Sequence, residues 1–149
     1  PAEQATTAEA PPPNPARRPA GEQRQLLYIE DNLSNLRLIE RALTHRPHIT
    51  LLTAIQGRLG LDLARQHQPD LVLLDLNLPD ISGREVLLAL RNDPRTAHIP
   101  VIVVSADATA RQIERLTADG AFAYLTKPLD ILEFLATIDR AITIDDKDA

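Results

Sequence analysis

The sequence predicts an α/β domain, a three-layer sandwich in which helices cover both faces of a five-stranded parallel sheet. Residues 71–74 and 101–104 are continuously apolar, as expected of strands that are covered on both faces. Segments with apolar residues at helical spacing lie between the strand candidates, so strands and helices alternate. Such alternation, with short connections, is typical of right-handed crossovers between parallel strands.

Each element can be placed along the chain. The strands are expected at residues 26–29, 49–54, 71–74, 101–104 and 121–125. The helices are expected at residues 34–43, 58–67, 82–91, 109–118 and 131–142. Leu36, Ile39 and Leu43 show the helical spacing in the first helix. Pro100 marks the start of the fourth strand, and Gly120 suits a left-handed residue after the fourth helix.

The composition bounds the classes of function. The chain has 149 residues, 44% of them hydrophobic and 25% charged, which is the balance of one ordinary globular domain. It has no cysteine, and its net charge of −5 argues against a nucleic-acid partner. No apolar run reaches the roughly 18–20 residues of a membrane span. We therefore expect a cytoplasmic protein of bacterial type without direct membrane contact, although its parent could be membrane-anchored.

Three regions are expected. Residues 1–24 form a Pro/Ala-rich linker or disordered tail, because six of the twelve prolines fall there and no apolar periodicity is present. Residues 25–144 form the domain, and residues 145–149 form a short polar end.

Polar residues follow four of the predicted strands. Glu30 and Asp31 come after the first strand, Asp75 ends the third, Ser105 ends the fourth and Lys127 follows the fifth. Ligands of such sheets bind outside the carboxyl ends of the strands. A single acid there is usually a helix cap or a loop charge. Three converging carboxylates repel one another, however, and the set makes sense around a hard cation such as Mg²⁺.

The other two side chains suit a phosphoryl group. A lysine supplies a point charge for a phosphoryl oxygen, and a hydroxyl can donate a hydrogen bond to another. Lys127 is one of only two lysines in the chain, which makes its position after a strand informative. A carboxylate that attacks phosphorus forms an acyl phosphate. Asp75 is therefore predicted to be a phosphoryl-accepting nucleophile.

In combination and in this order, the motifs resemble the response-regulator receiver domain of two-component signalling. They are residues 29–32 (IEDN), 74–83 (LDLNLPDISG), 104–106 (VSA), 120–121 (GA) and 124–128 (YLTKP). The resemblance covers about residues 26–142. It implies a flavodoxin-like sheet with strand order 2-1-3-4-5.

The resemblance also implies a metal centre and a phosphodonor. Asp75 would accept a phosphoryl group from the phosphohistidine of a histidine kinase or histidine phosphotransfer domain. Glu30 and Asp31, with Asp75 and the backbone carbonyl of Asn77, would hold Mg²⁺ or Mn²⁺. The acidic pair is Glu-Asp rather than Asp-Asp, a tolerated variation that keeps two carboxylates for the metal.

Further roles follow from the same resemblance. Ser105 matches the switch hydroxyl, Tyr124 the switch aromatic and Lys127 the phosphate-contacting lysine, and the bond before Pro128 is expected to be cis. Asp107, together with Asn77, matches positions that tune dephosphorylation. The face formed by the fourth helix, fifth strand and fifth helix would switch on phosphorylation, and it offers a surface for a homodimer.

The sequence leaves two rivals to the function of a phosphoacceptor receiver. One is a metal-dependent phosphohydrolase with an aspartyl-phosphate intermediate. In such enzymes the nucleophile belongs to an Asp-x-Asp motif near the first strand, whereas Asp75 lies in the third strand. The other is a degenerate receiver that only binds protein, although every catalytic position here keeps workable chemistry. The isolated domain is not expected to be an enzyme, apart from phosphorylating itself and slowly dephosphorylating itself. The linker favours the C-terminal receiver of a larger protein such as a hybrid sensor histidine kinase, with a stand-alone regulator as the alternative.

Overall fold

The computed structural model describes residues 23–107 and 109–148. Five parallel strands form one sheet in the order β2-β1-β3-β4-β5, which confirms the predicted fold class and strand order. The strands are β1 (Arg24–Ile29), β2 (Ile49–Ala54), β3 (Leu71–Asp75), β4 (Val101–Ser105) and β5 (Ala123–Thr126). The predicted linker lies almost wholly outside the described residues.

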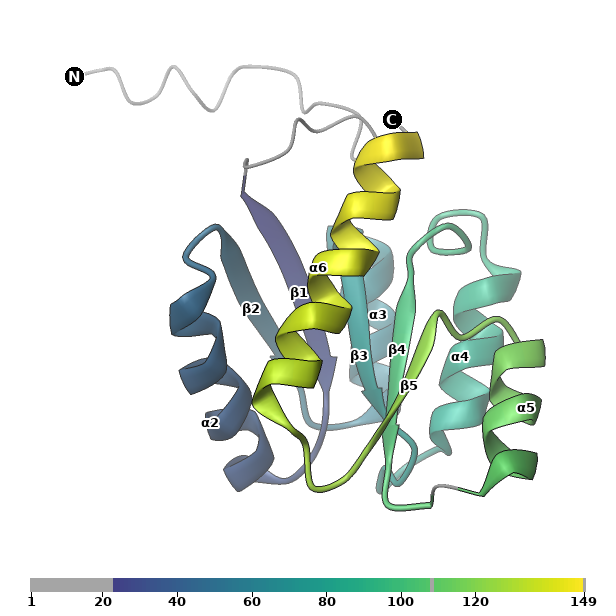
Figure 1. Ribbon diagram of the computed structural model, residues 1–149. Helices are drawn as coiled ribbons and strands as arrows, with labels where there is room; N and C mark the ends of the chain where they lie inside the picture. Colours follow the sequence, from purple (N-terminus) through teal and green to yellow (C-terminus); the bar gives the residue numbers. More distant parts are fainter. Residues whose placement is uncertain (1–22, 108, 149) are drawn as a thin grey trace.

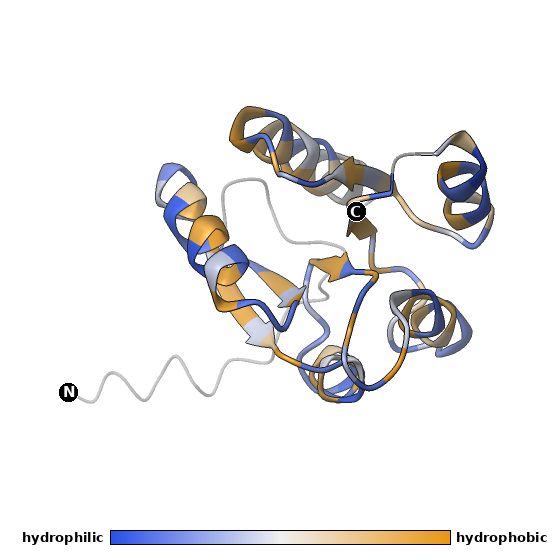
Figure 2. Ribbon diagram, turned by 90° about the horizontal axis from the view of Figure 1, so that it is seen from below, coloured by the Kyte–Doolittle hydropathy of each residue, from blue (hydrophilic) through white to orange (hydrophobic). Residues whose placement is uncertain are grey.

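Helices cover both faces of this sheet (Figure 1). They are α2 (Leu33–Ala42), the short 3₁₀ helix η2 (Leu43–His45), α3 (Gly57–His67), α4 (Gly83–Asn92), α5 (Ala110–Ala118) and α6 (Ile131–Asp148). α2 and α6 pack on one face, whereas α3, α4 and α5 pack on the other. Figure 2, turned to view the molecule from below, shows apolar strands between helices whose outward faces are hydrophilic.

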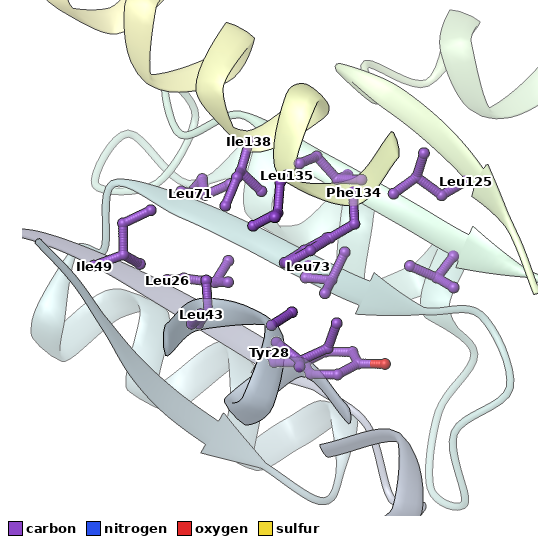
Figure 3. Packing of buried hydrophobic residues seen from close by; sticks show 14 of the residues in the cluster. Leu26, Tyr28, Leu43, Ile49, Leu71, Leu73, Leu125, Phe134, Leu135 and Ile138 are labelled. Carbon is purple, nitrogen blue, oxygen red and sulfur yellow. The ribbon is translucent and has the colours of Figure 1, made fainter. Parts of the chain in front are cut away.

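The alternation of side chains along the strands divides the core into two clusters. Leu26 and Tyr28 of β1 face α2 and α6, while Leu27 and Ile29 face α3 and α4. Every residue of β3 and β4 is buried, as predicted from their continuous apolar sequences. Figure 3 shows the first cluster, in which Phe134 of α6 lies among side chains of the sheet.

The helix starts differ slightly from those expected. Ser82 is the N-cap of α4 and forms a capping box with Glu85, and Thr109 is the N-cap of α5. Their side-chain oxygens accept backbone N–H groups that have no partner inside the helix. Gly120 has a φ of 105°, which confirms the left-handed position predicted after α5.

Two element ends were predicted wrongly. β5 begins at Ala123 rather than at residue 121, because the chain leaves α5 through a turn at Gly120. α6 continues past Ile142 to Asp148, where a polar end was expected. Neither glycine nor proline occurs between these positions, so nothing in the backbone ends the helix at Ile142. Among the described residues, no helix combines the length and the apolar character that crossing a membrane requires.

Candidate functional site

Three carboxylates meet at the carboxyl edge of the sheet. Glu30 and Asp31 follow β1, and Asp75 is the last residue of the neighbouring strand β3. One ligand oxygen from each of the three lies within 4.8 Å of the others. Glu30 and Asp75 are buried, whereas Asp31 is exposed. The structure thus brings together the three acids that the sequence predicts, with one of them open to solvent.

Lys127 joins two of these acids. Its ammonium Nζ lies 3.1 Å from Asp75 Oδ1 and 3.4 Å from Glu30 Oε1. The backbone N–H of Lys127 donates to the Ser105 carbonyl, which fixes the loop after β5 beside the end of β4. The Lys127–Pro128 peptide bond is cis, as the resemblance implied.

Glu30 is held by several donors besides Lys127. The Tyr28 hydroxyl and the Asn35 side-chain amide each donate to Glu30 Oε1 at 3.0 Å. The Asn32 backbone N–H donates to Oε2 at 3.2 Å. A buried carboxylate is stable as an anion when its oxygens are bonded in this way. Glu30 is therefore built into the site as a charged group.

The two buried carboxyl groups differ in acidity. The pKa of Asp75 is raised to about 6, first by burial and then by the charge of Glu30, while Lys127 opposes the rise. Burial also acts to raise the pKa of Glu30, but hydrogen bonding to Asp75 and the charge of Lys127 outweigh it and leave that pKa below the ordinary value. Of the pair, Asp75 takes up a proton first.

Lys127 and Tyr28 respond to the same charges. Burial acts to lower the pKa of Lys127, but its hydrogen bond and ion pair with Asp75 prevail, so the pKa is raised and the ammonium stays charged. Burial and the adjacent Glu30 carboxylate both raise the pKa of Tyr28. The Tyr28 hydroxyl consequently keeps its proton and remains a hydrogen-bond donor.

The loop after β3 is fixed from two sides. The Asn77 backbone N–H lies 3.4 Å from Asp75 Oδ1. Asp80 accepts hydrogen bonds from the first two backbone N–H groups of α3, those of Gly57 and Arg58, at 2.7 and 2.9 Å. A Cβ on Gly83 would lie 2.6 Å from the Asp75 carbonyl oxygen, so only glycine lets α4 begin this close to the strand end.

Ser105 lies at the end of β4, one position beyond Val104, which pairs with Asp75 in the sheet. The Ser105 hydroxyl is buried and accepts a hydrogen bond from the Asp107 backbone N–H at 3.1 Å. The Tyr124 hydroxyl donates to the Asp107 carbonyl, so Tyr124 is directed toward the loop after β4. The Asp107 carboxylate accepts the Thr109 backbone N–H at 3.0 Å.

The donor set fits a hard divalent cation. Carboxylate oxygens are the ligands that Mg²⁺ and Mn²⁺ prefer. Three carboxylates face one ammonium group within the cluster, so negative charge exceeds positive charge there. Burial and, after it, the charge of Glu30 raise the pKa of Asp75, and a bound cation would offset the repulsion between the two carboxylates. Asp31, Asp75 and Glu30 could hold the ion together with the Asn77 carbonyl.

Tyr28 and Asn35 were missed by the sequence analysis. Tyr28 stands two residues before Glu30 on one strand, so period-two alternation places both side chains on the same face. This spacing could have suggested their contact. Asn35 lies on α2, and only the packing of that helix brings its amide to Glu30. Asp80, whose role depends on the start of α3, was likewise not identified.

Comparisons with known proteins identify the family of the chain. The family model for the response regulator receiver domain matches residues 26–139. The polar-differentiation response regulator DivK of Brucella anthropi is 39% identical over 115 residues, which cover 77% of this chain and 93% of DivK.

Two solved structures are similar in fold. The receiver domain of sensor histidine kinase PA1611 from Pseudomonas aeruginosa PAO1, which has a magnesium ion in its active-site cleft, superposes with a TM-score of 0.74 at 25% identity. That match covers 81% of this chain and 98% of the other. The chemotaxis response regulator CheY4 of Vibrio cholerae gives a TM-score of 0.74 at 24% identity, covering 80% and 98% of the two chains. The family model and the identity with DivK show that the chain belongs to the response regulator receiver domains of two-component signalling.

Proposed function

We propose that this receiver domain takes a phosphoryl group from a phosphohistidine onto Asp75. The observation that carries the proposal is the contact between Lys127 Nζ and Asp75 Oδ1 inside a cluster of three carboxylates. It places a fixed cation beside a buried carboxylate at the end of a central strand. The donor would be a histidine kinase or a histidine phosphotransfer domain, the partners with which receiver domains in general interact.

The chemistry is a transfer between two nucleophiles. A carboxylate oxygen of Asp75 attacks phosphorus in line, the phosphorus–nitrogen bond of the phosphohistidine breaks, and the imidazole nitrogen keeps the electron pair. Lys127 neutralises oxygens of the transferring group, and Asp75 must be ionised to attack. A bound Mg²⁺ or Mn²⁺ would supply additional positive charge to these oxygens. Catalysis is then mainly positioning and electrostatic stabilisation.

The response of the protein would begin at Ser105. Its hydroxyl can leave the Asp107 backbone N–H and donate to a phosphoryl oxygen on Asp75. Movement of this loop would remove the acceptor of the Tyr124 hydroxyl, freeing the ring to turn inward. The face formed by α5, β5 and α6 would shift between two conformations, and this face is also the surface proposed for a homodimer.

Asn77 and Asp107 are proposed to set the lifetime of the phosphoryl group, since they follow Asp75 and Ser105 by two residues. Both side chains are polar and lie in loops at the mouth of the site. Replacing either residue should change the rate of spontaneous dephosphorylation without preventing phosphorylation. An unchanged lifetime in both variants would contradict this assignment.

Incubation with a small phosphodonor and Mg²⁺ tests the proposal. Intact-protein mass spectrometry should detect the gain of one phosphoryl group in the wild type and none in Asp75→Asn. Persistence of the gain in Asp75→Asn would refute the role of Asp75. Turnover of many equivalents of a phosphomonoester would instead favour a phosphohydrolase, and absence of labelling in the folded wild type would favour a receiver that only binds protein.

A further inference from the structure

Glu30 is the most heavily bonded carboxylate at the site, and the bonds are unequally divided between its two oxygens. Oε1 receives Tyr28, Asn35 and Lys127, the first two at 3.0 Å and the third at 3.4 Å. Oε2 receives the Asn32 backbone N–H at 3.2 Å. A carboxylate oxygen has about two lone-pair directions, so Oε1 is saturated and Oε2 is the oxygen with acceptor capacity to spare.

The hydrophobic core fixes the ring of Tyr28. Its side chain is completely buried in the cluster formed by β1, β3, α2 and α6. In Figure 3 the ring lies against the apolar side chains while the hydroxyl oxygen points out of the cluster. A buried phenol needs a hydrogen-bond partner, and Glu30 provides one. The position of the hydroxyl is therefore set by the core.

Asn35 approaches the same oxygen from α2. Asn32 caps this helix by accepting the Asn35 backbone N–H at 3.0 Å, which fixes the first turn beside the site. One oxygen of Glu30 thus meets both the strand residue Tyr28 and the helix residue Asn35. Glutamate at position 30 and its two donors thus form one unit.

We propose that Tyr28 and Asn35 are positioning residues that lock the Glu30 carboxylate in one orientation. Their hydrogen bonds to Oε1 turn Oε2 toward the cation site. They also fix the position of the Glu30 carboxylate relative to Lys127. The inference rests on the proposed function, because it assigns these residues a role in the metal affinity of the same centre. It predicts that their effect on the cation is transmitted through Glu30 alone.

The test is a double-mutant cycle on Mg²⁺ affinity, measured by titration calorimetry on the whole chain. Tyr28→Phe keeps the ring and removes the donor, and should weaken Mg²⁺ binding roughly tenfold, as is usual for groups that orient ligands. Asn35→Ala, at a half-buried position, serves if the first variant unfolds. In a Glu30→Gln background each change should alter the affinity by less than about twofold. Thr44→Val, which removes an exposed hydroxyl of η2, is the matched control.

Tyrosine fluorescence gives a second readout, which would not respond to Mg²⁺ if the role of Tyr28 were only structural. The chain has two tyrosines and no tryptophan, so Tyr28 is the sole aromatic phenol in a Tyr124→Phe background. Its fluorescence should change during the Mg²⁺ titration with the midpoint found by calorimetry, because the hydroxyl is bonded to a group that faces the cation.

The outcomes separate this inference from the proposed function. If the wild type fails to bind Mg²⁺, both are overturned. If the wild type binds Mg²⁺ and Asp75→Asn does not, but Tyr28→Phe and Asn35→Ala bind as the wild type does, only the inference is overturned. The inference would also be overturned if Tyr28→Phe changed the Mg²⁺ affinity equally in the wild-type and the Glu30→Gln backgrounds. A Tyr28 fluorescence that does not change with Mg²⁺ would overturn it as well.

Discussion

Lys127 Nζ lies 3.1 Å from Asp75 Oδ1, although 52 positions separate the two residues in the chain. The contact crosses from the loop after the edge strand β5 to the end of the central strand β3, and β4 lies between them. A lysine placed there compensates the buried Asp75 charge and is available to the oxygens of a group transferred to it. The predictions below depend on this pair and its neighbours.

Replacing Lys127 should slow phosphorylation without removing the acceptor. Lys127→Ala is expected to lower the rate of labelling by a small phosphodonor about 10²-fold, the usual effect of losing one preorganised electrostatic contact. Arg58→Ala removes a charged side chain of α3 that is 74% exposed, and this variant should leave the rate unchanged. Equal rates in Lys127→Ala and the wild type would contradict the role of Lys127.

The buried Asp75 charge should make stability depend on pH in the absence of a divalent cation. Its pKa is about 6 in the folded protein and 3.8 as the ordinary value, so between these values the folded state holds a proton that the unfolded state has lost. The free energy of unfolding therefore falls as the pH rises through this interval. Asp75→Asn should be more stable than the wild type at pH 8, by on the order of 1–3 kcal/mol.

Urea denaturation in the presence of a chelator checks this sign. The advantage of Asp75→Asn should shrink as the pH is lowered from 8 toward 4, because folded wild-type Asp75 becomes protonated and the buried charge is lost. Asp62→Asn, which alters a carboxylate whose side chain is 67% exposed, is the control and should show no comparable gain. A variant less stable than the wild type at pH 8 would contradict the assignment of a strained charge to Asp75.

Mg²⁺ should stabilise the wild-type domain. A ligand that binds only the folded state adds about 2.7 kcal/mol to the free energy of unfolding at 100 times its dissociation constant. The melting temperature should rise with Mg²⁺ concentration in the wild type and stay constant in Asp31→Asn, which removes the exposed acid of the cluster. A melting temperature that rises equally in both proteins would place the cation elsewhere.

Gly83 should not tolerate a side chain. The Cβ of Gly83→Ala would approach the Asp75 carbonyl oxygen and the Leu76 Cα to 2.6 Å, and these backbone atoms cannot turn away. The variant is expected to lose about 1–3 kcal/mol of stability, with slower phosphorylation because the strand end is displaced. Denaturant unfolding measures the first effect. Wild-type stability and labelling in Gly83→Ala would show that α4 can retreat without consequence.

The sequence contains much of this fold because its central strands are continuously apolar. Residues 71–74 and 101–104 were predicted to be strands covered on both sides, and the structure confirms both. The end of α6 could not be predicted from the apolar pattern, because the helix continues to Asp148 after the last apolar position used for that prediction. The start of β5 was predicted two residues too early, since a turn at residues 119–120 and a bend at Phe122 precede the strand.

The acids of the site were predictable because parallel strands bring their carboxyl ends to one edge of the sheet. What could not be predicted is how each group is held. The contact of Asn35 with Glu30 requires the packing of α2. The hydrogen bonds that Asp80 accepts from the Gly57 and Arg58 backbone N–H groups require the loop after β3 to meet the start of α3. Such contacts depend on tertiary structure and leave no periodic pattern in the sequence.

The central claim is that the Asp75 carboxylate itself carries the phosphoryl group. Borohydride reduces an acyl phosphate of aspartate to homoserine, so treating the labelled protein and sequencing its peptides by mass spectrometry identifies the acceptor. We predict homoserine at position 75 and unmodified residues at positions 30 and 31. Homoserine at position 31, or a phosphoryl group that resists borohydride on another type of side chain, would contradict the account.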